Sequence, residues 1–266
     1  MGAYYNENDP KAAAWLRELI KQNLIAPGDV DERSIEDVTP NELREYQQCH
    51  FFAGIGVWSY ALRQAGWSDE RPVWTGSCPC QPFSAAGKGE GVDDERHLWP
   101  AFQRLIALRR PELVLGEQVA GKAGGAWFDI VSTDLEGEGY ACGQVVFQAC
   151  SVGAPHLRQR LYWVADSSQT GQLECEKHSN GEAQPGDDPG GCGVACAGPG
   201  PVNSHWRDSD WLFCRDGKWR PVESGTFPLV NGAPARVGRL RGYGNAIVAA
   251  QAKEFIKAII WNPTKK

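Results

Sequence analysis

The sequence predicts an α/β fold built around a mostly parallel β-sheet. Runs rich in β-branched and aromatic residues, such as 73–75 and 111–115, alternate with segments that carry apolar residues at helical spacing, such as 99–109. This alternation is typical of parallel sheets, because each parallel connection needs a crossover, usually a helix. With 266 residues and 42% hydrophobic content, the chain can bury one main core and form an additional small lobe.

The N-terminal part contains the first of these units. Asp9 and Pro10 favour a helix start, as N-cap and first helical residue, for a helix over 11–23. A second helix is predicted over 40–46. A buried strand over 49–52 is then expected, followed by a glycine turn and a further helix.

The C-terminal part continues the alternation after an interruption. Between 166 and 201, Gly, Pro, Ser and acidic residues dominate, which predicts a long loop or a partly disordered insertion. Residues 211–220 predict a hairpin, with Asp216-Gly217 as its turn and aromatic residues on both arms. The remaining elements are expected to be helices over 99–109, 127–136 and 249–260 and strands over 111–115, 143–149 and 160–165.

Composition narrows the class of protein. No apolar run approaches the roughly 20 residues that span a bilayer, and a signal-peptide pattern is lacking, so we expect a cytoplasmic protein with no membrane partner. The nine cysteines lack the short spacing of a disulfide scaffold, which favours reduced thiols. The net charge of −6 is uneven: residues 201–266 carry eleven basic and five acidic side chains, +6, which leaves −12 for the rest. A basic lobe can bind a phosphate backbone, although ordinary surface charge is the alternative.

A cysteine framed by prolines follows the predicted strand at 73–75. Pro79 and Pro82 prevent regular helix or ladder hydrogen bonding, so Cys80 is expected on a stiff loop at the carboxyl end of that strand. In open α/β sheets this edge is where ligands bind. The alternative is that Cys78 and Cys80 are small buried apolar residues, the commonest role of a reduced cysteine.

Five motifs along the chain resemble those of the DNA (cytosine-5) methyltransferases. They are the S-adenosylmethionine loop Phe52-Ala53-Gly54-Ile55-Gly56, the nucleophile loop Pro79-Cys80-Gln81-Pro82-Phe83-Ser84, Glu117-Gln118-Val119 for Glu-Asn-Val, His156-Leu157-Arg158-Gln159-Arg160 for Gln-x-Arg-x-Arg, and Gly244-Asn245-Ala246-Ile247 for Gly-Asn-Ser-Val. Each motif is modest alone. Five of them in the family's order, over about 200 residues, are hard to obtain by chance.

The resemblance implies a Rossmann-like S-adenosylmethionine-dependent methyltransferase fold and a role for each motif. Cys80 is the implied nucleophile that adds to C6 of a cytosine flipped out of DNA, and Glu117 the group that binds or protonates N3. Arg160 would contact the pyrimidine carbonyl, with Arg158 supporting the loop. The implied cofactor-binding residues are Phe52, Gly54, Ile55, Gly56, Glu7, Asp29, Val30, Pro79, Leu98, Asn245 and Ala246.

The order of the cofactor motifs departs from the family. Only about twenty residues separate Gly56 from Cys78, too few for the two βα units that the family places there. Residues 6–9, Asn-Glu-Asn-Asp, resemble the family's Asn-Glu-x-Asp, and residues 28–30, Gly-Asp-Val, resemble its Gly-Asp-Ile. We therefore predict a circular permutation in which residues 1–48 supply these two units from the other end of the chain.

Two positions of this predicted half-site differ from the family. Asn8 stands where the family usually has an apolar residue that packs on adenine, and His50 stands where it usually has Asp. The alternative is that Glu7 and Asp29 are ordinary solvent-exposed carboxylates.

The predicted domains are a catalytic domain over 1–166 and 236–266 and a small target-recognition lobe over 167–235. The tryptophans of its hairpin could equally form the lobe's own apolar core. Residues expected to contact DNA are Gln81, Ser84, Arg215, Lys218 and Arg220. No metal is predicted. A weak zinc-like spacing is formed by Cys175, His178, Cys192 and Cys196. The favoured interpretation is that these four side chains occur together incidentally.

The resemblance implies a monomeric enzyme acting on double-stranded DNA, with a short recognition lobe like those of phage or prophage methyltransferases. Two other functions stay open. One is methylation of cytosine in tRNA by the related enzymes that share these motifs. The other is a catalytically inactive, methyltransferase-like DNA-binding protein, which Gln118 in place of Asn and His156 in place of Gln keep possible.

Overall fold

The computed structural model describes residues 2–79, 98–154, 157–168 and 246–260, together with the backbone of two strands in the interval between the last two ranges. The chain folds as two compact units. The first consists of residues 1–170 and 232–266, and the second of residues 171–231.

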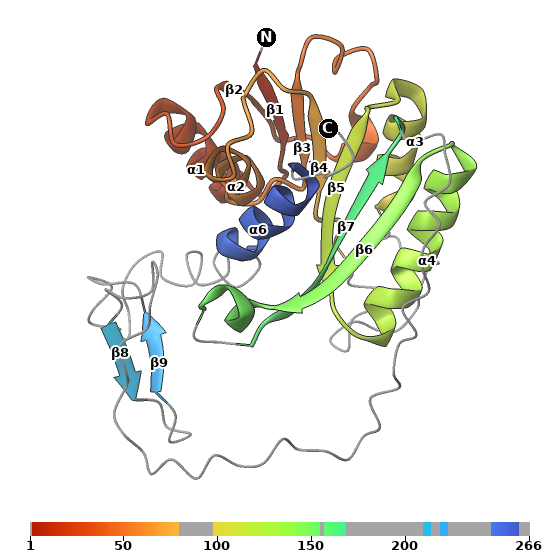
Figure 1. The fold of residues 1–266 in the computed structure, drawn as a ribbon. Coiled ribbons are helices and arrows are strands. Elements are labelled where there is room, and N and C mark those ends of the chain that lie inside the picture. The colour runs from red at the N-terminus through yellow and green to blue at the C-terminus, as the bar shows by residue number, and fades with distance from the viewer. Residues whose placement is uncertain are drawn as a thin grey trace. The chain divides into compact units, whose positions relative to one another are not determined.

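The first unit is built on one seven-stranded sheet with the order β2-β1-β3-β4-β5-β7-β6 (Figure 1). The strands from β2 to β5 pair in parallel, whereas β7 runs antiparallel between β5 and β6. The predicted mostly parallel sheet is therefore confirmed. The strands are β1 (Ala3–Asn6), β2 (Gly28–Asp31), β3 (Gln48–Phe51), β4 (Val73–Gly76), β5 (Leu113–Val119), β6 (Ala141–Gln148) and β7 (Gln159–Asp166).

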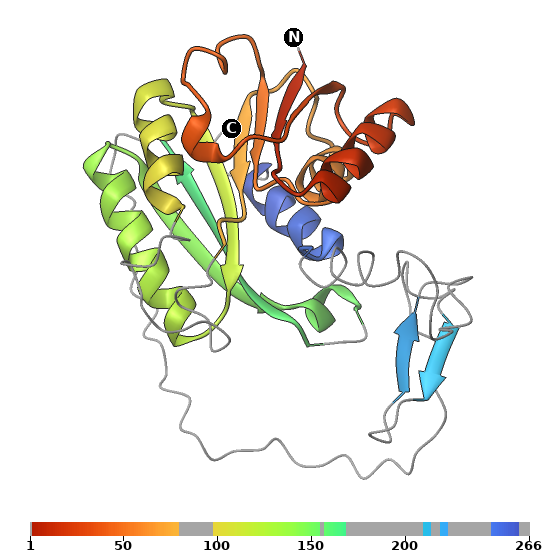
Figure 2. The same cartoon turned by 180° about the vertical axis from the view of Figure 1, so that it is seen from behind.

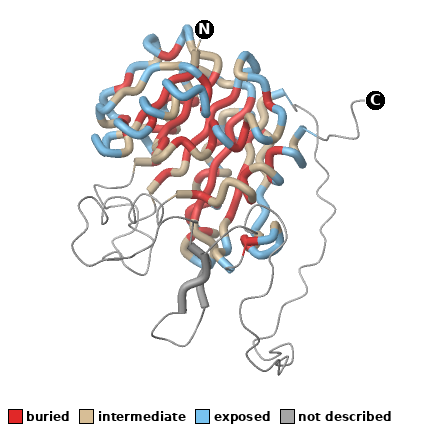
Figure 3. Tube along the Cα trace, turned by 90° about the vertical axis from the view of Figure 1, so that its left-hand side faces the viewer, coloured by how far each residue is buried: buried red, intermediate tan, exposed pale blue. Residues whose placement is uncertain are grey.

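Helices cover both faces of the sheet, as Figures 1 and 2 show. One face carries α1 (Pro10–Lys21), α2 (Val57–Gln64) and α6 (Ala249–Ile260), and the other carries α3 (Trp99–Arg109) and α4 (Lys122–Gly137). Two short 3-10 helices, η1 (Ile35–Asp37) and η4 (Ala149–Val152), follow β2 and β6. Buried residues concentrate along the strands between these two layers (Figure 3).

The N-terminal segment forms part of the sheet rather than an appendage. Asp9 caps α1 by accepting a hydrogen bond from the Lys11 amide at 2.8 Å, and Pro10 is the first helical residue, as predicted. The Tyr5 hydroxyl lies 2.6 Å from the Ala26 carbonyl oxygen and 2.9 Å from the Ser59 hydroxyl of α2. These buried hydrogen bonds join β1, the connection before β2 and the helix after the glycine turn.

The helix predicted over 40–46 is wrong, because this segment forms turns. The Glu42 carboxylate accepts hydrogen bonds from the Thr39 amide at 2.8 Å and the Thr39 hydroxyl at 2.7 Å. The Tyr46 hydroxyl donates to Asp29 of β2 at 2.8 Å. A seven-residue segment cannot offset the cost of helix nucleation, and these side-chain bonds stabilise turns instead.

The apolar core on the α3 and α4 face is mainly aromatic. Trp99, Trp127 and Trp163 are each at most 1% exposed, and neighbouring ring centroids lie 5.8 to 6.4 Å apart. The Trp163 indole lies directly over Gly116 of β5. A Cβ at residue 116 would lie 2.1 Å from a ring carbon of that indole, so the packing requires glycine there.

Replacing Gly116 by Ala is expected to lower the free energy of unfolding by about 3 kcal/mol, because the rigid indole and its packed neighbours would have to move. Chemical denaturation measures this change. The matched control is Gly125→Ala in α4, where an added Cβ meets nothing within 4 Å and should leave stability equal or higher. Equal stability of Gly116→Ala and wild type would contradict the packing described.

A buried histidine lies on β3, between its neighbours β1 and β4 in the sheet. His50 of β3 is 1% exposed, its Nδ1 lies 2.8 Å from the Thr75 hydroxyl oxygen, and its ring stacks on Tyr5 with centroids 4.9 Å apart. Burial lowers the pKa of His50 to about 3. The unfolded chain therefore binds a proton at this residue over a pH range in which the folded protein does not.

Stability is expected to fall on acidification because of His50. Its contribution is fully present above the unfolded pKa of about 6.5 and is lost progressively as the pH falls toward the folded value of about 3. Between pH 7 and pH 5, wild type should lose about 2 kcal/mol more unfolding free energy than His50→Gln, which does not titrate. Parallel slopes for the two proteins in denaturation series would refute this assignment.

The second unit contains an antiparallel strand pair, β8 (Asp210–Phe213) and β9 (Trp219–Val222), in which Phe213 pairs with Trp219. The arms of the predicted hairpin are thus present, and the turn between them lies outside the described residues. Across the described part of the chain, the helices are too short or too polar to cross a membrane.

Candidate active site

The predicted cofactor-binding motifs meet where β1 and β3 end side by side, with Asn6 paired with Phe51. The Glu7 carboxylate follows β1 and accepts hydrogen bonds from the Gly54 amide at 2.7 Å and the Asp9 amide at 3.0 Å. A contact across 47 residues thus joins the N-terminal acid to the glycine turn. The structure brings these two predicted motifs together.

The glycine turn after β3 has an unusual backbone. Phe52, Gly54 and Gly56 all have left-handed φ values, 53°, 56° and 79°. A Cβ at Gly54 would meet only the Phe52 carbonyl oxygen, at 4.0 Å, so the turn is open on that side. A Cβ at Gly56 would approach Leu16 of α1 to 3.0 Å, so this glycine allows the turn before α2 to lie close to α1.

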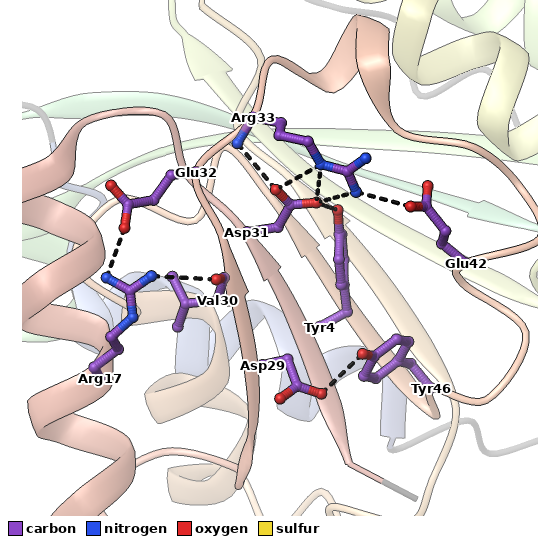
Figure 4. A pocket seen from close by; sticks show the side chains of 9 residues that line it. All are labelled: Tyr4, Arg17, Asp29, Val30, Asp31, Glu32, Arg33, Glu42 and Tyr46. Atoms are coloured by element: carbon purple, nitrogen blue, oxygen red, sulfur yellow. Dashed lines mark hydrogen bonds and ion pairs between the residues drawn. The ribbon is translucent and has the colours of Figure 1, made fainter.

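The other predicted cofactor residues of this segment line a different feature, a surface hollow of about 450 Å³ along β2 (Figure 4). Asp29 accepts from the Tyr46 hydroxyl there, and the Val30 carbonyl accepts from Arg17 at 3.4 Å. The residues lining the hollow are Tyr4, Arg17, Asp29, Val30, Asp31, Glu32, Arg33, Glu42 and Tyr46, and do not include Glu7 or the glycine turn.

A carboxylate that the sequence interpretation missed ends β2. Asp31 accepts from the Tyr4 hydroxyl at 2.7 Å and forms an ion pair with Arg33 at 2.7 Å. Burial raises the pKa of Asp31, but the hydrogen bonds from Arg33 and Tyr4 outweigh it and lower the value to about 2. Arg33 also contacts Glu42 at 3.0 Å, so this network fixes the segment between β2 and β3. The signal in the sequence was the run of charged residues directly after the strand.

Glu117 and Arg160 form an ion pair on adjacent strands. The Arg160 Nε lies 2.8 Å from the Glu117 Oε1. Glu117 of β5 is 8% exposed and stands opposite Tyr162 of β7. Burial raises the pKa of Glu117 to about 7, although the charges of Arg160 and Arg158 oppose this shift. At neutral pH this carboxyl group can therefore exist with or without its proton.

Arg158 links two predicted motifs that are distant in sequence. Its Nη2 donates to the Ala246 carbonyl oxygen at 2.7 Å, across 88 residues. Burial, and then the nearby Arg160, lower the pKa of Arg158. The arginine motif is thus held between the acid of β5 and the segment that precedes α6.

The segment leading to Cys80 is anchored beside this acid. The Gln118 side chain donates to the Cys78 carbonyl oxygen at 3.3 Å and accepts from the Val119 amide at 2.9 Å. Trp58 of α2 donates from its indole nitrogen to the Ser77 hydroxyl at 3.0 Å. Gln118, which departs from the family's Asn, therefore connects the end of β5 to the start of the cysteine loop. Cys78 itself is 3% exposed and packs in the apolar core, as the alternative for this residue predicts.

The structure leaves part of the predicted site undescribed. Pro79 and Leu98 border the cysteine loop, and Leu98 packs against the aromatic core. Arg220 lies in β9, where only the backbone is described. Outside the described residues lie Cys80, Gln81, Ser84, His156, Asn245, Arg215, Lys218 and the weak metal candidates Cys175, His178, Cys192 and Cys196.

Comparison with known proteins agrees with the motifs. Residues 69–185 match the family model described as C-5 cytosine-specific DNA methylase. The Type II methyltransferase M.NaeI of Lentzea aerocolonigenes is 30% identical over 162 residues, which cover 60% of this chain and 33% of M.NaeI. The Type II methyltransferase M.PspPI of Psychrobacter sp. is 30% identical over 169 residues, which cover 47% of this chain and 41% of M.PspPI.

A solved structure, a triple mutant of Spodoptera frugiperda DNMT2, aligns over 65% of this chain and 52% of its own, with a TM-score of 0.39 and 14% identity. The chain spans less than half the length of the two curated relatives.

The seven-stranded sheet, in which β7 runs antiparallel to both of its neighbours, agrees with the family match in indicating a Rossmann-like methyltransferase fold. Over residues 69–185, 44% of its length, the chain is similar in sequence to the C-5 cytosine-specific DNA methylases.

Proposed function

We propose that the protein is a DNA (cytosine-5) methyltransferase that transfers a methyl group from S-adenosylmethionine to C5 of cytosine. The observation that carries this proposal is the buried pair of Glu117 and Arg160, 2.8 Å apart, beside the anchored start of the Cys80 loop. A carboxyl group that titrates near pH 7 and a fixed guanidinium suit a pyrimidine ring, which offers a ring nitrogen and a carbonyl oxygen.

The residues at the ends of β1 and β3 fit a nucleoside cofactor. The Glu7 carboxylate can accept hydrogen bonds from ribose hydroxyls, and the open turn at Gly54 allows the backbone to approach a ligand closely. Phe52, Ile55 and Gly56 would complete this side, and Asp29, Val30, Pro79, Leu98, Asn245 and Ala246 remain proposed contacts. S-adenosylmethionine, when bound, supplies an electrophilic methyl group.

The proposed chemistry starts with covalent addition, because C5 of cytosine is a poor nucleophile. The Cys80 thiolate adds to C6, and the ring electrons move toward N3, where Glu117 supplies a proton or a hydrogen bond. Arg160 holds the pyrimidine carbonyl oxygen. After methylation, loss of the C5 proton allows the C–S bond to break and releases Cys80. Because C5 and C6 are inaccessible in a duplex, the target base must be flipped out.

We also propose that the chain is circularly permuted relative to its family. The strand order places β1 and β2 beyond β3, although both precede β3 in the sequence. Photo-crosslinking of labelled S-adenosylmethionine would test this proposal: labelled peptides should come from residues 2–31 as well as from 52–56, and their absence from the first range would contradict it.

Residues 167–235, which include the second unit at 171–231, are proposed as the target-recognition lobe. Gln81, Ser84, Arg215, Lys218 and Arg220 are proposed to contact DNA, since basic side chains bind phosphates and amide or guanidinium groups read base edges.

The decisive assay for the activity is transfer of labelled methyl groups to mixed-sequence duplex DNA and, in parallel, to tRNA. The proposal predicts 5-methylcytosine in the DNA only. Label in tRNA alone would assign the protein to the related RNA-modifying enzymes. Binding to DNA without label in either substrate would favour an inactive DNA-binding protein.

A further inference from the structure

A buried glutamine interrupts the apolar face of α6. Gln251, the third residue of this helix, is 0% exposed, and its neighbours Ala252, Phe255 and Ile256 pack in the apolar cluster that contains Tyr162. Burying a side-chain amide in apolar surroundings is unfavourable unless it forms hydrogen bonds. An apolar residue of similar size would suit this face. The hydrogen-bond partners of the Gln251 amide must therefore explain why a polar side chain is buried there.

The amide group of Gln251 connects two strands at the point where their ladder stops. Its Nε2 lies 3.0 Å from the carbonyl oxygen of Phe147 in β6 and 3.5 Å from that of Arg158. The ladder between β6 and β7 ends at the pair Gln148 and Gln159, so Arg158 lies just beyond it. The side chain of Gln251 therefore holds the two backbones together by hydrogen bonds just beyond the last residue pair of the β6–β7 ladder.

In a second contact, Arg158 is the donor and the segment next to α6 is the acceptor. The Arg158 Nη2 donates to the Ala246 carbonyl oxygen at 2.7 Å, three residues before α6 begins. The segment around α6 thus holds both the backbone and the side chain of Arg158. Arg160, two residues along, carries a like charge on the same side of the strand and is paired with Glu117 at 2.8 Å. Two neighbouring guanidinium groups keep separate directions only if each is held.

We propose that Gln251 is a positioning residue: it fixes the backbone at Arg158 so that Arg158 and Arg160 keep the directions in which they bind Ala246 and Glu117. The role in catalysis rests on the proposed methyltransferase function. The positioning itself is a property of the folded chain. It does not depend on substrate or cofactor.

Gln251→Met tests this inference, since methionine has a similar shape and lacks the amide. Gln48→Met is the matched control, because Gln48 is also buried, 1% exposed, and donates to the Ser68 carbonyl oxygen at 3.0 Å on a different part of the sheet. Gln251→Met loses the hydrogen bonds to the Phe147 and Arg158 carbonyl oxygens, and Gln48→Met loses the one to Ser68. Hydrogen exchange over residues 147–160 is measured first, and steady-state methylation second.

Positioning predicts at least fivefold faster exchange over 147–160 in Gln251→Met only. It also predicts a kcat lowered at least tenfold, with the KM for S-adenosylmethionine changed less than twofold. Equal exchange in the two variants would overturn the inference, as would equal kcat values in an active protein. If wild type transfers no methyl group, the proposed function fails, and hydrogen exchange alone decides whether Gln251 positions the arginines.

Discussion

Replacing Cys80 by Ser is expected to lower the rate of methyl transfer roughly 10³-fold or more, because removal of a covalent nucleophile eliminates the reaction path it provides. A hydroxyl group of similar size is not appreciably ionised near neutral pH and adds poorly to C6. Initial rates with labelled S-adenosylmethionine and duplex DNA measure the effect. Calorimetry should show unchanged cofactor binding, which separates lost chemistry from lost folding.

The matched control for this variant is Cys150→Ser. Cys150 is exposed in η4, and its thiol donates to the Gln148 side chain at 3.2 Å, so the same substitution there should leave the rate within about twofold of wild type. A Cys80→Ser protein with wild-type activity would exclude the covalent route.

Replacing Glu117 by Gln is expected to lower kcat by about 10²- to 10⁴-fold, the usual range for a positioned acid. The variant should also change the pH dependence. Because burial raises the pKa of Glu117 to about 7, the fraction that can donate a proton falls as the pH rises through this value. The kcat of wild type should therefore decrease above about pH 7, whereas the small residual rate of Glu117→Gln should not.

Stability gives an independent test of the same residue. The folded pKa of Glu117, about 7, lies above the usual value of 4.5, so its stabilising contribution is fully present below the unfolded pKa and is lost as the pH rises through the folded one. The unfolding free energy of wild type relative to Glu117→Gln should therefore decrease between these values. Glu138→Gln, which removes a surface contact to Arg110 at 3.5 Å, should change neither activity nor this slope. A difference that does not decrease over this pH range would show that Glu117 is ionised throughout.

Much of the fold follows from local sequence. Helix α3 has the predicted bounds Trp99–Arg109, and α6 has the predicted bounds Ala249–Ile260, because both carry apolar residues at helical spacing and a proline, Pro111 or Pro263, follows shortly after each. The direction of β7 could not be predicted, since a buried strand has the same composition whichever way it runs. The segment 40–46 misled because its helical pattern is too short to outweigh side-chain bonds from Thr39 and Tyr46.

The candidate site also has features that the sequence predicts and features that depend on the folded structure. Glu117 and Arg160 were identified from motifs, but the burial that raises the pKa of the acid depends on packing of β5 beside β7, which sequence spacing does not reveal. Asp31 and Gln251 have no motif, and only their long-range partners distinguish them from ordinary polar residues. The contact of Glu7 with Gly54 was anticipated only as a shared half-site, without its geometry.

Covalent trapping on duplex DNA that contains 5-fluorocytosine tests the central claim most directly, because fluorine at C5 cannot leave as a proton does and the thioether to C6 persists after methylation. A covalent route through Cys80 predicts a denaturation-resistant protein–DNA adduct that requires S-adenosylmethionine, forms with Cys150→Ser and is absent with Cys80→Ser. Two results would contradict this route. One is the absence of an adduct on mixed-sequence DNA when the wild-type protein methylates the same DNA without fluorine. The other is an adduct that still forms with Cys80→Ser.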